Sequence, residues 1–354
     1  MFENVRCLCG KIMKSTIEVG WNTTCTFEDD KLNCAFVDGI GKFMINDALE
    51  ISTLSANTSL SILSGFGIND GTTLEVKKVF VGLEEVMDLL KQSMLSKTPM
   101  TDVFLLKQKE INTKAIIAKP LNVMFQSDTK RVDLDLFVRK SDKKILYAVA
   151  KADFLDFLFS FLTFPMGSVV ELLGGSSSIG SIDNIYKSVE GLYHIDPEKL
   201  ERSMDMLLHP KIASQHGCEN QLLQIEEKQE TISISKCSHC FKKGIADMWC
   251  RHGLDRAKLS LINPKFIGTD TLEGGRFIKD SMVFMITDEL VVEPYSQISC
   301  ISYLNKQCVS FRDIEERSVT VGGQEALSLL YASLTSKTAL ASVFCQSSRK
   351  RTQR

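Results

Sequence analysis

The alternation of apolar and polar positions first predicts a β-hairpin followed by a helix. Val132, Leu134, Leu136 and Val138 alternate with mostly charged residues, which is the period-two pattern of a strand with one buried face. The polar KSDKK then leads into ILYAVA at 145–150, whose β-branched and aromatic residues indicate a returning strand.

The next stretch, 154–165, is apolar on nearly every face and predicts a buried helix. Asp156 interrupts the stretch and Pro165 closes it. It is shorter than the roughly 20 residues that a bilayer span requires. We therefore expect no membrane span.

The chain also resembles itself. FMINDALEISTL at 43–54 matches FMITDELVVEPY at 284–295, and residues 81–98 are identical to residues 321–338 at nine of eighteen positions. A near-constant offset also aligns RCLCGK at 6–11 with the segment around Cys250 and His252. We interpret this similarity as an internal repeat.

Each copy shows the same succession of predicted elements. Strands lead to a helix, placed near 299–305 in the second copy, and a β-like run, KKVFVG or RSVTVG, precedes a further helix. After the SKT triplet, Thr98 is suited to cap a new helix with Pro99 at its first position. The predicted fold class is α+β: repeated β-hairpin plus helix modules in mixed α/β layers, with a small zinc-ribbon-like loop insertion.

The repeat and the polar stretches set the expected domain boundaries. We predict a partial copy of the C-terminal half-module at 1–106, a linker at 107–130, a first half-module at 131–209, a polar linker with a zinc loop at 210–260, a second half-module at 261–346 that repeats 20–106, and a basic tail at 347–354.

Composition limits the cellular compartment and the kinds of partner that we expect. The 42 basic and 44 acidic residues nearly cancel, so a charged partner would have to meet a local patch. Eleven cysteines without an apolar leader near Met1 favour a reducing compartment, the cytoplasm or the nucleus.

The strongest candidate chemistry is a metal site in KCSHCFKKGIADMWCRHG at 236–253. Cys237 and Cys240 have the two-residue spacing that places both sulfurs on one side of a turn. Cys250 and His252 complete four ligands, and His239 is an alternative to His252. Four protein ligands leave no open position, which favours structural over catalytic zinc.

Two other segments are candidate ligand sites. Residues 236–258 carry six Lys or Arg against two Asp, with Phe241 and Trp249 between them, which keeps nucleic-acid binding open. GGSSSIGS at 174–181 precedes a predicted helix but lacks the lysine of a phosphate-binding loop. We interpret it as a connector, with Ser181 or Asp183 as the helix cap.

These segments resemble the plant family known as domain of unknown function 674. The resemblance rests on LDLFVRKSDKKILYAVAKADFLDFLFSFLTFPMGSVVELLGG, SIGSIDNIYKSVEGL, and FMITDELVV with SLTSKTALASVF. It implies one full unit preceded by a partial one, and a cysteine pair in the middle of the module, similar to Cys237 and Cys240. The spacing of Cys250 and His252 departs from the more regular second pairs of the family.

The sequence favours a non-enzymatic binding or scaffold protein whose partner is another protein. Repeated modules with a small metal loop supply surfaces, and no nucleophile with a recognisable base stands out. The alternatives are nucleic-acid binding through the basic Cys/His loop and an enzyme of unknown class with a cleft between modules.

Overall fold

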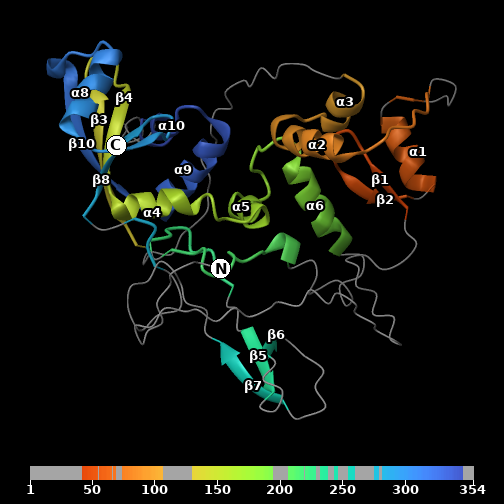
Figure 1. Ribbon diagram of the computed structural model, residues 1–354. Coiled ribbons are helices and arrows are strands. Elements are labelled where there is room, and N and C mark those ends of the chain that lie inside the picture. The colour runs from red at the N-terminus through yellow and green to blue at the C-terminus, as the bar shows by residue number, and fades with distance from the viewer. Residues whose placement is uncertain are drawn as a thin grey trace, which may run out of the picture. The chain divides into compact units, whose positions relative to one another are not determined.

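The protein has an α+β fold (Figure 1). The computed structural model describes residues 42–54, 56–65, 67–68, 74–106, 130–193, 206–218, 220–228, 232–237, 243–245, 254–259, 275–278 and 281–345. The chain forms two compact units. One contains the described residues of 150–164 and 211–283, and the other those of 33–149, 165–210 and 284–354.

The largest sheet joins strands from distant parts of the sequence. Its order is β10-β3-β4-β8-β9, formed by β10 (Ile314–Val321), β3 (Val132–Arg139), β4 (Ile145–Lys151), β8 (Val283–Thr287) and β9 (Val292–Pro294). The hairpin predicted from the alternating pattern is confirmed as the antiparallel pair of β3 and β4. On its other edge, β3 pairs antiparallel with β10 from Val132↔Val321 to Arg139↔Ile314.

Helix α8 (Gln297–Lys306) covers one face of this sheet. Its amino end is capped by the Ser296 hydroxyl, which accepts a hydrogen bond from the Ser299 N–H at 3.0 Å. Below the helix lies a core cluster of Leu146, Tyr147, Met285, Cys300, Leu304 and Val309. The helix predicted near 299–305 is therefore confirmed, and its buried face explains why it forms there.

The apolar stretch after β4 forms the buried helix α4 (Ala152–Ser160), as predicted. Phe154 and Phe157 are fully buried. Pro165 precedes the short helix α5 (Met166–Leu172), at a position where its fixed φ and missing N–H cost nothing. Helix α6 (Ile182–Tyr193) follows, and Tyr186 packs with Val170 of α5 and with Leu208.

The N-terminal elements match C-terminal ones in length and order. Helix α2 (Leu83–Leu95) corresponds to α9 (Gly323–Thr335), and α3 (Pro99–Phe104) corresponds to α10 (Ala339–Phe344). The hairpin of β1 (Phe43–Ile45) and β2 (Ile51–Thr53) precedes α1 (Ala56–Gly65), just as β8 and β9 precede α8. Leu49 and Leu290 have the same left-handed conformation, with φ of 60° and 62°.

The matched elements also share local hydrogen bonds. Glu85 accepts from the Gly82 N–H at 2.9 Å, and Glu325 accepts from the Gly322 N–H at 3.1 Å, so each carboxylate caps the start of its helix. Asp47 accepts from the Thr101 N–H, and Asp288 accepts from the Ala341 N–H, both at 2.8 Å. Burial raises the pKa of Asp288, although its hydrogen bonds to the backbone of α10 act in the opposite direction.

One predicted strand is absent. KKVFVG, at the N-terminal place that corresponds to the end of β10, does not form a strand, and residues 74–82 have no ladder partner among the described residues. The difference has a physical cause. The N–H and C=O groups of β10 bond to β3, whereas no described strand lies beside residues 74–81. A β pattern alone does not make a strand, because the ladder requires a partner.

The N-terminal elements dock on α6 and on the turn before it. Four hydrogen bonds join them: Ser181 N–H to Ser93 O (2.7 Å), Ser181 Oγ to Ser96 O (3.0 Å), Asn184 Nδ2 to Ala48 O (2.8 Å) and Ile51 N–H to Ser188 Oγ (2.8 Å). Ser93 and Ser181 are buried. The contact is therefore closely packed at the end of α2.

Gly180 allows this close approach. Its φ is +48°, and a Cβ at this position would lie 2.3 Å from Ser93 O. We expect Gly180→Ala to destabilise the protein by about 2–4 kcal/mol, because it combines backbone strain with a clash against main chain. Urea unfolding gives the free energy, and hydrogen exchange in α2 locates the loss.

Gly174→Ala is the matched control. Gly174 also has a positive φ, +65°, but a Cβ there meets nothing within 4 Å. Only the strain of about 1 kcal/mol is expected. Equal losses in the two variants would show that the close contact at Ser93 contributes nothing.

Candidate functional site

Of the four predicted metal ligands, the structure describes the backbone of one. Cys237 is the last residue of β5 (Ile232–Cys237), while Cys240, Cys250 and His252 lie outside the described residues, as does the alternative His239. In the part of the chain that is described, no three His, Cys, Asp or Glu side chains gather as a metal site. The zinc site therefore stays a prediction.

The strands around these residues nevertheless share one end of a small sheet. Strand β5 pairs antiparallel with β6 (Lys243–Ile245) through Lys236↔Lys243 and with β7 (Leu254–Leu259) through Cys237↔Leu254. The carboxyl end of β5 thus lies beside the amino ends of both neighbours. Cys240 falls in the segment that joins β5 to β6, and Cys250 and His252 fall shortly before β7.

The glycine- and serine-rich turn at 174–181 is hydrogen-bonded to a carboxylate of the helix that follows it. Asp183 of α6 accepts hydrogen bonds from the Ser177 and Ser178 N–H groups, each at 3.0 Å. These are the donors that a phosphate would require. Ser181 directly precedes α6, and its carbonyl accepts from the Asn184 and Ile185 N–H groups at 3.1 and 3.3 Å. Its hydroxyl donates to Ser96 O at 3.0 Å.

Among the described residues, Asp156 of α4 is the most buried carboxylate. It lies in the unit that contains residues 150–164 and 211–283. It is fully buried and accepts from the Phe277 N–H at 2.7 Å, the Ile278 N–H at 3.0 Å and Arg276 Nε at 3.1 Å. Arg276 also forms an ion pair with Asp153. A carboxylate with these partners and no exposure ties 275–278 to α4 and has no surface to offer a substrate.

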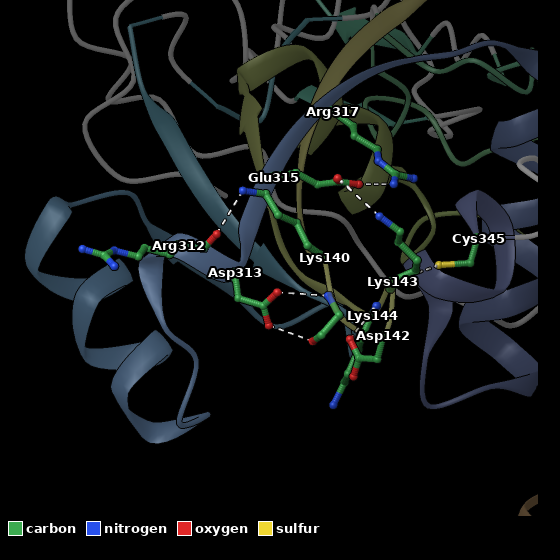
Figure 2. Close-up of polar contacts among 10 residues, drawn as sticks. Lys140, Asp142, Lys143, Lys144, Arg312, Asp313, Glu315, Arg317 and Cys345 are labelled. Atoms are coloured by element: carbon green, nitrogen blue, oxygen red, sulfur yellow. Dashed lines mark hydrogen bonds and ion pairs between the residues drawn. The ribbon is translucent and has the colours of Figure 1, made fainter.

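The charged turn of the β3–β4 hairpin is hydrogen-bonded to the segment before β10 (Figure 2). The Asp313 carboxylate, in η2 (Phe311–Asp313), accepts from Ser141 N–H at 3.0 Å and Ser141 Oγ at 2.7 Å, and Lys140 Nζ donates to Arg312 O at 3.0 Å. These contacts hold the start of β10 against the hairpin turn.

Glu315 and Cys345 both contact Lys143 of this turn (Figure 2). Desolvation opposes ionisation of Glu315, but hydrogen bonds and charges from Arg317 and Lys143 outweigh it and lower the pKa of Glu315. Burial raises the pKa of the Cys345 thiol, which donates to Lys143 O at 3.6 Å. A protonated thiol bound to main chain is structural rather than nucleophilic.

Two hollows on the described surface have simple linings. One lies on α8, beside Ile298, Ile301 and Lys306, and the other lies where β2 meets α6, beside Ile51, Asn184 and Ser188. Neither lining contains a His or Cys.

The most unusual surface among the described residues lies at 74–90. It carries the exposed side chains of Leu74, Val76, Val79, Phe80, Val81, Leu83, Val86, Met87 and Leu90, which we call the N-terminal apolar surface. Val76, Phe80 and Leu83 are 91%, 86% and 79% exposed. Large exposed apolar patches are uncommon on monomeric proteins, so these residues are the candidate contact surface.

The same positions are covered in the C-terminal elements. Val81 is 52% exposed where Val321 is 0%, and Met87 is 58% exposed where Leu327 is 0%. Leu90 is 49% exposed where Leu330 is 2%. Sequence reasoning missed this surface, although residues 74–90 are rich in apolar side chains.

The described residues form an α+β protein in which N-terminal helices correspond to C-terminal ones. It also has a small three-stranded sheet and an exposed apolar segment at 74–90. The sequence model of the family described as "Protein of unknown function (DUF674)" matches residues 1–324, and the chain belongs to this family. No curated protein and no solved structure matches the chain significantly. No helix among the described residues is long and apolar enough to cross a membrane.

Replacing Asp156 and Asp153 one at a time distinguishes the structural roles of these two carboxylates. We expect Asp156→Ala to cost about 3–5 kcal/mol in the free energy of unfolding, because it removes the buried acceptor for Arg276 and for two partly buried N–H groups. Asp153 is half exposed, at 51%, so Asp153→Ala is the control and should cost about 1 kcal/mol or less. Equal urea midpoints for the two variants would contradict this account.

Proposed function

We propose that this protein is a non-enzymatic binding or scaffold protein that contacts another protein through the N-terminal apolar surface. The observation that carries the proposal is the contrast between α2 and α9. The two helices have the same length and the same carboxylate cap, yet α9 is covered and α2 is exposed along its apolar face.

The energetics favour an occupied surface. Burying one large apolar side chain contributes about 1.5–3 kcal/mol, and Phe80 and Leu83 are almost fully exposed. Leaving several such groups in water gives the free chain a strong tendency to bind. An interface would recover this free energy, less the cost of association.

The surrounding charges favour a protein as the partner. Lys77, Lys78 and Lys91 lie among Glu75, Glu84 and Asp88, and Glu75 forms an exposed ion pair with Lys77 at 3.5 Å. A mixed polar border around an apolar centre is typical of protein interfaces. A surface for nucleic acid or anionic lipid would instead carry an excess of basic residues.

Site-specific photo-crosslinking tests the proposal. A photoreactive phenylalanine analogue at Leu83 should give discrete adducts with partner proteins in cells of the source organism. The control places the same analogue at Ile298 of α8, which is 81% exposed. Adducts that are the same from both positions, or none from Leu83, would refute the proposal.

We also propose a structural zinc ion at the end of the small sheet, held by Cys237, Cys240, Cys250 and His252. The shared strand end supports this second proposal, since β5 to β7 bring the flanks of these residues together. Zinc would order a loop with little core of its own, as apparent binding of about 10–16 kcal/mol is typical of such sites.

Metal analysis of the purified protein tests the zinc site. We expect about one zinc ion per chain, lost when Cys237 and Cys240 are both replaced by Ser, because two of the four ligands disappear. Cys308→Ser is the control, since Cys308 is an exposed free cysteine. Absence of zinc from the wild-type protein, or its retention in the double variant, would exclude the site.

A further inference from the structure

We propose that the partner of the N-terminal apolar surface supplies a β-strand, which pairs antiparallel with residues 74–81 and carries alternating apolar and acidic side chains. This inference rests on the proposed function and specifies its partner. The template is the pairing of β10 with β3 within this chain.

The template fixes direction and register. Val321 faces Val132, Val319 faces Leu134, and Ser318 faces Asp135 across the ladder. On the outer face, Ser318 Oγ donates to Asp135 at 2.6 Å and Thr320 Oγ1 donates to Asp133 at 2.9 Å. Over residues 132–136, the strand opposite β10 thus alternates apolar residues on one face with acidic residues on the other.

Residues 74–81 suit such a strand at the corresponding positions. Val79 and Val81 stand where β10 has Val319 and Val321, so the apolar contacts are retained. Lys78 stands where β10 has Ser318, opposite an acidic side chain. An opposite-charge pair across the ladder is favourable, and the lysine makes the fit to an acidic strand stronger than in β10 itself.

A second copy of this chain fits less well. Its β3 is already paired along its full length with its own β10. Self-pairing of residues 74–81 about their centre would place Lys77 opposite Lys78 of the other copy, and like charges directly opposite are unfavourable. The partner is therefore a different protein with a free strand edge.

Strand addition would also begin to cover α2. In the C-terminal elements, β10 leads directly into α9, whose Leu327 and Leu330 are buried. Met87 and Leu90 hold these positions in α2 and are exposed. A partner that extends beyond the added strand would have the means to shield both segments.

The probe is a fluorescent peptide of residues 130–151, KRVDLDLFVRKSDKKILYAVAK, titrated with the full-length protein. We expect saturable binding by fluorescence anisotropy. Lys78→Glu in the protein should weaken binding about fivefold, the size of reversing one cross-strand charge pair. Val79→Glu, which places a charge opposite Leu134 of the peptide, should weaken it at least about tenfold.

Charge exchange tests the register. A peptide with Asp135→Lys should bind the Lys78→Glu protein about as well as the original pair bind, and should bind the wild-type protein more weakly. Lys97→Glu is the control, because Lys97 is an exposed lysine outside residues 74–81. Thermal unfolding should be unchanged in all three protein variants, since each replaces an exposed side chain.

Three outcomes would overturn the inference: no peptide binding, binding that is indifferent to the charge exchange, or self-association of the protein that Val79→Glu abolishes. The first two, together with specific cross-links from Leu83, would leave the proposed function standing with a different partner. Peptide binding without any cross-linked partner would instead support the strand contact and refute the proposed function.

Discussion

The pairing of β10 with β3 is the contact on which the rest of the C-terminal architecture depends. It joins residues 314–321 to residues 132–139 through a continuous antiparallel register. On the other edge of β3 the sheet continues with β4, β8 and β9, and α8 packs on its face. Without β3, the backbone groups of β10 would need another partner or water.

Residues 74–81 demonstrate this dependence within the same molecule. They occupy the place of β10 in the N-terminal elements and carry comparable β-branched and aromatic residues, yet they are exposed and outside any ladder of the described structure. Sequence pattern predicted a strand there because pattern reports local preference. Strand formation also requires a neighbour, which no local pattern contains.

Other elements were predictable because their causes are local. The alternation in β3, the apolar run of α4 and the Thr98–Pro99 start of α3 each specify an element within a few residues. The partners of Asp156 were not predictable, since they come from residues 276–278, far away in sequence. The bond from Ser181 Oγ to Ser96 O was not predictable for the same reason, since Ser96 lies far from Ser181 in the sequence.

The carboxylate caps of α2 and α9 have a consequence for how an exposed helix keeps its form. Each helix is preceded by a glycine whose N–H donates to a glutamate three residues later, and this bond needs nothing beyond the helix itself. The start of α2 is therefore stabilised from within, although its apolar side chains face water. Such a helix offers a preformed set of side chains, so that a binding partner would not have to order it at a cost in conformational entropy.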